Sequence, residues 1–124
     1  MTFRRSMLAT LLLLLLAWPT FAMLRYTEIT PDNSVLLANA LGRRENFDES
    51  RTTPICFIKI DSVQTEPMVD GDTYAYDLQG CAVNEFRGFG VCKHGACSVA
   101  NRYHVQIFAP RGASSATIEN LWQL

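Results

Sequence analysis

The sequence of 124 residues lacks several features that would point to common functions. It contains no basic block of the kind that follows a phosphate backbone, and its formal net charge is only −1 at pH 7. A nucleic-acid partner is therefore not expected. After residue 22 no apolar run approaches the ~20 residues needed to span a bilayer, so membrane insertion is not expected either. Residues 23–124 also contain no internal repeat and no low-complexity tract.

Residues 1–22 have the three parts of a secretory signal peptide. A pair of arginines forms a basic start, the run from Met7 to Ala17 is apolar, and Thr20-Phe21-Ala22 places small residues at the cleavage positions. The sequence predicts cleavage after Ala22 and one secreted, extracellular domain at 23–124. The alternative is an uncleaved membrane anchor, for which the apolar run is short.

Four cysteines remain in that domain, and an even number in a small secreted domain favours two disulfides: Cys56, Cys81, Cys92 and Cys97. Three pairings are possible, and the sequence alone does not choose among them. Zinc is a weaker interpretation of the cysteines near His94, because a closed zinc site uses four ligands and secreted cysteines oxidise. A cysteine nucleophile needs a free thiolate, and four paired cysteines leave none. The sequence therefore predicts no enzymatic activity, no metal and no cofactor.

Thr30-Pro31-Asp32 is typical of a helix start. Thr30 can cap the helix, Pro31 fits the first helical position, and Asp32 meets the positive end of the helix dipole. Apolar residues at helical spacing follow from Val35 to Leu41. Gly42 could end the helix as a C-cap or lie inside it at a cost of about 1 kcal/mol. We predict a helix that extends to about Asn46.

The rest of the domain has the pattern of strands joined by turns. Asp70-Gly71 is a recognised hairpin signal, and a second turn is predicted after the third strand. Because the helix must bury its apolar face on a sheet, the sequence predicts an α+β fold with one helix packed on a four- to five-stranded antiparallel sheet, stabilised by disulfides. We expect an extended segment at 24–29, strands at 55–63, 72–80, 101–108 and 116–122, turns at 67–71 and 109–112, and a loop at 84–95.

The central stretch resembles the cystatin family. Cystatins carry a Gln-x-Val-x-Gly hairpin followed by a strand with tyrosines; here Val69 and Gly71 stand at the matching places, and Gly71-Asp72-Thr73-Tyr74-Ala75-Tyr76 continues in the same manner. Val105-Gln106-Ile107-Phe108-Ala109-Pro110 is similar to the strand and second hairpin of secreted cystatins. The resemblance covers most of 23–124 and implies a cystatin-like fold of the secreted, type 2-like kind, in a divergent form.

The sequence also departs from the family pattern. Pro67 replaces the glutamine of the first hairpin, and Arg111 replaces the tryptophan of the second. The family's N-terminal glycine has no clear counterpart near Leu24 and Arg25.

The cysteines follow the family only in part. Cys81 and Cys92 have nearly the spacing of the first disulfide of secreted cystatins, so the resemblance implies a Cys81–Cys92 bridge and leaves Cys56 to pair with Cys97. The second disulfide of those cystatins cannot form, because no cysteine follows Cys97.

The resemblance implies inhibition of a papain-like, cathepsin-type cysteine protease without any catalytic residue. Three edges would form a wedge that enters the active-site cleft and blocks access to the thiol. Mapped onto this chain, the protease-binding wedge consists of Leu24, Arg25, Pro67, Met68, Val69, Asp70, Gly71, Pro110 and Arg111.

Other interpretations stay open. The altered Pro67 and Arg111 favour a secreted effector, such as a venom or salivary protein, that binds another extracellular protein and has lost inhibition. A third interpretation is a cathelin-like pro-domain. The absence of a cationic peptide after the last predicted strand counts against this interpretation. Both hairpins could also be plain exposed turns. We expect a monomer, although hairpin exchange could give a swapped dimer.

Overall fold

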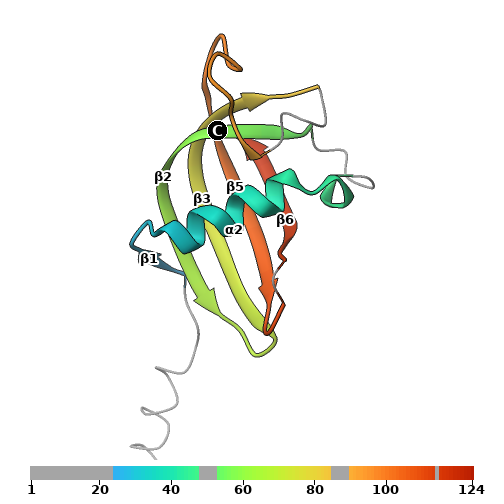
Figure 1. Ribbon diagram of the computed structural model, residues 1–124. Coiled ribbons are helices and arrows are strands. Elements are labelled where there is room, and N and C mark those ends of the chain that lie inside the picture. Colours follow the sequence, from blue (N-terminus) through green and yellow to red (C-terminus); the bar gives the residue numbers. More distant parts are fainter. Residues whose placement is uncertain (1–23, 48–52, 85–89, 114) are drawn as a thin grey trace, which may run out of the picture.

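The computed structural model describes residues 24–47, 53–84, 90–113 and 115–124. In this part of the chain a single α-helix lies across one face of a curved sheet (Figure 1). The elements in chain order are β1 (Arg25–Thr27), α2 (Pro31–Gly42), the 3-10 helix η2 (Arg44–Asn46), β2 (Ile55–Pro67), β3 (Gly71–Ala82), β4 (Gly90–Val91), β5 (Asn101–Pro110) and β6 (Thr117–Gln123).

The predicted α+β class is confirmed: within the described ranges one α-helix packs on a largely antiparallel sheet, which has six strands rather than the predicted four or five, in the order β1-β2-β3-β5-β6. The sixth strand, β4, pairs with β2 in parallel, through Cys56 opposite Gly90 and Phe57 opposite Val91. Part of the segment predicted as a loop is therefore a strand. β2 is longer than predicted because its ladder with β3 continues up to Pro67 opposite Asp72, and β3 is longer because it continues to Ala82 opposite Ile55.

The helix begins where the sequence predicts. The hydroxyl of Thr30 accepts a hydrogen bond from the backbone N–H of Asn33 at 3.2 Å, and the Asn33 side chain accepts one from the N–H of Thr30 at 2.9 Å. This reciprocal capping satisfies two N–H groups that a helix start leaves without partners. The predicted extension of the helix to Asn46 is wrong, because Arg43 is extended and separates α2 from η2.

The core lies between α2 and the sheet. Leu37, Ala40 and Leu41 are fully buried on the helix side, and Tyr76 and Val105 are fully buried beneath them. Burial of side chains of this size stabilises the fold by about 1.5–3 kcal/mol each. The Tyr76 hydroxyl also donates a hydrogen bond to the carbonyl of Asn33 at 2.9 Å, which ties the first turn of the helix to β3.

Two disulfides cross-link the end of the sheet where β2 begins and β3 ends. They join Cys56 to Cys92 and Cys81 to Cys97. The expected pairings of Cys81 with Cys92 and of Cys56 with Cys97 are therefore both wrong. The reason is the path of the chain: β4 lies beside β2, and the N–H of Cys92 donates to the carbonyl of Phe57 at 2.9 Å, which brings Cys92 next to Cys56.

The predicted signal peptide at 1–22 lies outside the described residues, as do residues 85–89 of the predicted loop. In the described ranges no helix has the length and apolarity that a bilayer crossing requires.

Candidate functional site

The β2–β3 and β5–β6 hairpins lie side by side at one end of the sheet, at the bottom of Figure 1. They meet because β3 pairs with β5, so that Gly71 stands opposite Pro110 and Asp72 opposite Ala109. We call this end, formed by residues 67–71 and 110–112, the rim. The rim joins two turns that are about forty residues apart in sequence.

Each turn is closed by its own backbone hydrogen bond. In the first hairpin the N–H of Met68 donates to the carbonyl of Gly71 at 2.7 Å. In the second the N–H of Ala113 donates to the carbonyl of Pro110 at 3.1 Å, and Gly112 has a positive φ of 78°. That conformation is strained for residues with a Cβ, so the second turn depends on glycine.

Arg111 connects the two turns. Its backbone N–H donates to the carbonyl of Asp70 at 2.8 Å, and its guanidinium Nη2 donates to the carbonyl of Met68 at 3.1 Å. Gly71 allows this close approach, since a Cβ there would contact the carbonyl oxygen of Ala109 and lie 2.8 Å from the Cα of Pro110. The rim is thus held by cross-hairpin bonds as well as by the ladder behind it.

The rim presents apolar side chains to solvent. Val69 is 92% exposed and Met68 is 45% exposed, with the exposed carboxylate of Asp70 beside them. An exposed apolar side chain on a fixed turn can be buried by a partner with little loss of backbone entropy. The rim therefore offers a small contact surface of apolar groups flanked by charge.

The N-terminal segment lies along the edge of the sheet and starts near the rim. β1 is antiparallel to β2, with Arg25 opposite Thr65 and Thr27 opposite Val63, and the hydroxyls of Thr27 and Thr65 are 2.6 Å apart. Leu24 precedes β1 on the rim side and is exposed. This segment therefore flanks the first hairpin.

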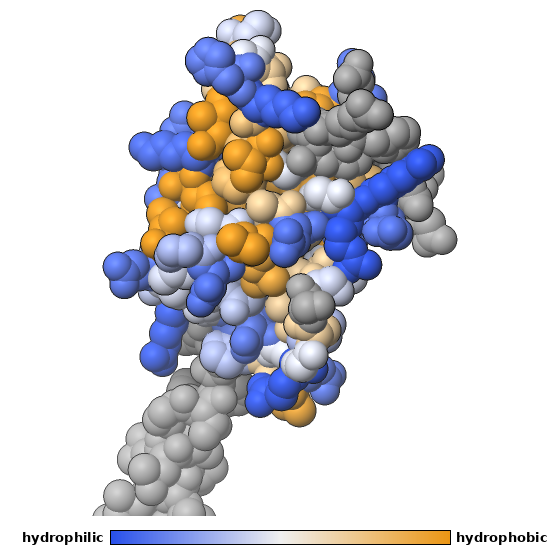
Figure 2. Space-filling view, in the orientation of Figure 1, coloured by the Kyte–Doolittle hydropathy of each residue, from blue (hydrophilic) through white to orange (hydrophobic). Residues whose placement is uncertain are grey.

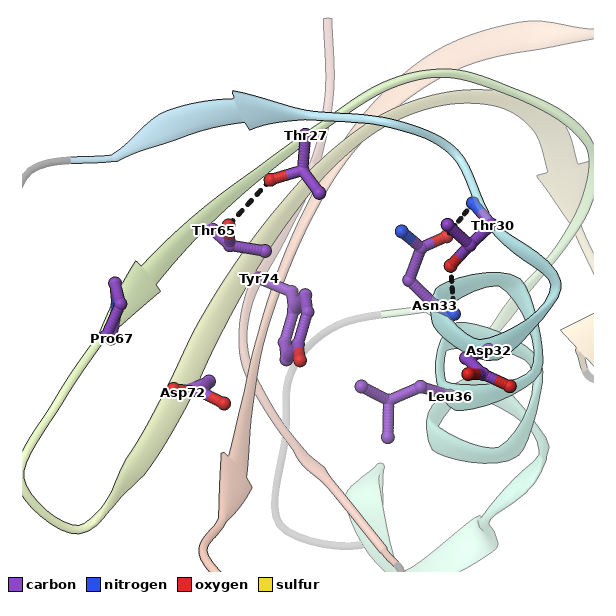
Figure 3. Close-up of a pocket in the computed structure, with 9 residues that line it drawn as sticks. All are labelled: Thr27, Thr30, Asp32, Asn33, Leu36, Thr65, Pro67, Asp72 and Tyr74. Carbon is purple, nitrogen blue, oxygen red and sulfur yellow. Dashed lines mark hydrogen bonds between the residues drawn. The ribbon is translucent and has the colours of Figure 1, made fainter.

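A hollow lies behind the rim on the helix side (Figure 3). It comprises two open pockets of about 520 and 440 Å³ that share Leu36, Asp72 and Tyr74. Figure 3 shows Tyr74 of β3 and Leu36 of α2 pointing toward one another across the larger pocket. Burial raises the pKa of Tyr74, and the Asp72 carboxylate adds to this shift. The Tyr74 hydroxyl thus stays protonated at neutral pH and can donate a hydrogen bond.

The broader apolar surface of this side lies elsewhere. Figure 2 shows it gathered above the helix, away from the rim. Val35 of α2 and Val91 of β4 are more than half exposed. The rim is therefore distinguished by its projecting tips rather than by a wide apolar face.

The structure brings together most of the residues that the sequence suggested for a wedge. Leu24 and Arg25 lie along the flanking edge rather than in the turns, and the four cysteines lie at the opposite end of the sheet. The residues that meet at the rim are Pro67, Met68, Val69, Asp70, Gly71, Pro110 and Arg111.

One polar cluster on the face of the sheet away from the helix was not predicted. His104 Nδ1 lies 2.7 Å from Asp77 Oδ1, and the His104 ring stacks on Trp122 with centroids 4.3 Å apart. Alternation along β3 and β5 places each side chain on this face. Their meeting depends on the pairing register of three strands, which the sequence does not reveal.

No model of a protein family matches the sequence, and a search of solved structures finds no match to this chain. The likeness to cystatins therefore stays a prediction that depends on the residues quoted above.

Proposed function

We propose that the chain is a secreted, cystatin-like inhibitor of papain-like cysteine proteases that inserts its rim into the active-site cleft. The observation that carries this proposal is the alignment of two hairpins on one edge, fixed by Gly71 opposite Pro110 and by the hydrogen bond from Arg111 to Asp70. A wedge requires such an edge, and hairpins at opposite ends of the sheet would have excluded it.

The mechanism needs no catalytic group on this chain. Met68 and Val69 would be buried against the walls of the cleft, and the turn would block access to the protease thiol. Each such side chain contributes up to about 1.5–3 kcal/mol when fully buried. Hairpins that are already ordered lower the cost of binding, because ordering a loop at an interface opposes association.

The test is inhibition of papain or a cathepsin by the purified domain. We expect residual protease activity to fall as the concentration of the domain rises. The complex should remain intact when it is diluted into a solution of substrate. Full protease activity at micromolar excess of the domain would overturn the proposed activity. It would leave the fold untouched.

A second candidate is a secreted effector that binds another extracellular protein and no longer inhibits proteases. It is favoured by Arg111, which stands where the cystatin pattern has tryptophan. Its guanidinium donates a hydrogen bond to the carbonyl of Met68 within the chain, so the second hairpin has no aromatic side chain at this place to bind a partner. Tryptophan is a strong anchor at interfaces. The double change Pro67→Gln and Arg111→Trp separates the two candidates: a gain in inhibition indicates a weakened wedge, and no change indicates another binding surface.

A further inference from the structure

The sulfur atoms of the four cysteines form one compact cluster at the end of the sheet opposite the rim. All four Sγ atoms lie within 4.8 Å of one another. Sulfurs that belong to different disulfides are also close, with Cys56 Sγ 3.9 Å from Cys81 Sγ and Cys92 Sγ 3.6 Å from Cys97 Sγ. Four thiolates at ~2.3 Å from a tetrahedral zinc ion lie about 3.8 Å apart. Two pairs that are not bonded to each other already have this separation.

The backbone holds three of these cysteines in place independently of the disulfides. Cys56 and Cys81 are directly opposite in the β2–β3 ladder. Cys92 follows β4, and its N–H donates to the carbonyl of Phe57 at 2.9 Å. Reduction of the sulfurs does not itself break these backbone bonds, so a reduced chain that keeps this pairing keeps the three cysteines close together.

The fourth cysteine is kept near by a short connection. The N–H of Ala96 donates to the carbonyl of Lys93 at 3.0 Å, which forms a turn between Cys92 and Cys97. Four residues between two cysteines is a spacing that zinc sites use. The ligand pairs would thus be Cys56 with Cys81 from the sheet and Cys92 with Cys97 from the turn.

We propose that the reduced chain binds one zinc ion through Cys56, Cys81, Cys92 and Cys97. A dithiol or phosphine reductant supplies two electrons to each disulfide, each bridge takes up two protons, and four thiols result. Zinc then displaces the four thiol protons and forms four Zn–S bonds. The site is closed and structural, because all four positions are filled by protein ligands.

The metal would replace the disulfides as the cross-link between the sheet and the turn. Cys56 and Cys81 are buried. Thiolates there would be costly without a cation beside them. Zinc-bound and disulfide-bonded forms would therefore be alternative states of one cluster, selected by the redox conditions. This inference is independent of the proposed protease inhibition.

The test uses the full domain, reduced with a phosphine and titrated anaerobically with Co²⁺ and then Zn²⁺. We expect one equivalent of Co²⁺ to give the thiolate charge-transfer and d–d absorption of a tetrahedral site, and Zn²⁺ to displace it. The oxidised domain should give no such spectrum. Absence of the spectrum in the reduced domain would overturn the proposal.

Two variants identify the ligands in the reduced domain. Cys81→Ser should weaken Co²⁺ binding by more than about tenfold, since even loss of a supporting residue around a metal ligand costs about 10–100-fold. His94→Ala should bind Co²⁺ as the unaltered domain does, because His94 is not part of the cluster. Unchanged Co²⁺ binding by Cys81→Ser, together with weakened binding by His94→Ala, would overturn the proposed four-cysteine site. If reduction unfolds the domain, one equivalent of Zn²⁺ should restore its circular dichroism, and failure to do so would also contradict the proposal.

Discussion

The guanidinium of Arg111 donates a hydrogen bond to the carbonyl oxygen of Met68 at 3.1 Å and so joins the second hairpin to the first. The residues lie 43 positions apart in the chain. They meet because the neighbouring strands β3, which begins at the rim, and β5, which ends there, pair with Gly71 opposite Pro110. The two turns of the rim are therefore coupled, and a substitution in one turn should change the conformation or mobility of the other.

Arg111→Ala should loosen the first hairpin without unfolding the domain. The backbone bond from Arg111 to Asp70 stays, so only the side-chain contact to Met68 is lost. We expect faster amide hydrogen exchange at Met68, with a loss of global stability below about 1 kcal/mol. Arg102→Ala, an exposed arginine toward the other end of β5, is the matched control and should leave exchange at Met68 unchanged. Equal exchange in both variants would contradict the role of Arg111.

Gly71→Ala should destabilise the domain and separate the two hairpins. The added Cβ would contact the carbonyl of Ala109 and lie 2.8 Å from the Cα of Pro110, so the backbone must shift. We expect a loss of about 1–3 kcal/mol, measured by chemical denaturation. Gly42→Ala is the control, because a Cβ there meets no atom within 4 Å; it should be neutral or stabilise by up to about 1 kcal/mol. A Gly71 variant as stable as the Gly42 variant would exclude the close approach.

Stability should fall at alkaline pH because of Tyr76. Burial raises its pKa well above the ordinary value of 10.0, and nearby Tyr74 adds to the shift. The unfolded chain therefore releases this proton first, so the contribution is complete below pH 10 and decreases as the pH rises above it.

Tyr76→Phe should lower the free energy of unfolding at neutral pH by about 1 kcal/mol, because the hydrogen bond to the carbonyl of Asn33 is lost. It should also flatten the decline above pH 10. Thermal unfolding of both proteins between pH 7 and 11 measures the effect. An unchanged alkaline slope in the variant would show that another group is responsible.

Peptide mapping without reduction should recover Cys56 linked to Cys92 and Cys81 linked to Cys97. Replacing Cys56 and Cys92 together by serine should cost about 4 kcal/mol, and replacing Cys81 and Cys97 about 3 kcal/mol, since the first bridge closes the longer loop, with separations of 36 and 16 residues. Denaturation midpoints of the two double variants test this order. Recovery of a Cys81–Cys92 peptide would contradict the pairing.

Local signals predicted the parts of the fold that depend on neighbours in the chain. Thr30, Pro31 and Asn33 begin the helix through contacts within a single turn. Asp70-Gly71 marks a hairpin for the same reason. The end of the helix was predicted too late. A glycine such as Gly42 can either end a helix or lie inside one, and in the structure Arg43 is extended and the helix ends at Gly42.

Long-range features were not predictable in the same way. The disulfide pairing depends on where β4 pairs with β2. β4 is only two residues long and lies in a glycine-containing segment, so its sequence has no strand pattern. The contact from Arg111 to Met68 depends on the register of β3 and β5. The sequence predicted Arg111 and Met68 as turn residues of a wedge, but it could not show that the Arg111 side chain donates a hydrogen bond to the Met68 carbonyl.

Inhibition of papain by three forms of the domain tests the central claim most directly. Val69→Asp places a charge on the 92% exposed tip, and Val99→Asp places one at a 68% exposed position at the other end of the sheet. The account predicts that the unaltered domain and Val99→Asp inhibit equally. Val69→Asp should raise the inhibition constant at least about tenfold, or about 1.4 kcal/mol. Equal inhibition by both variants, or none by the unaltered domain, would contradict it.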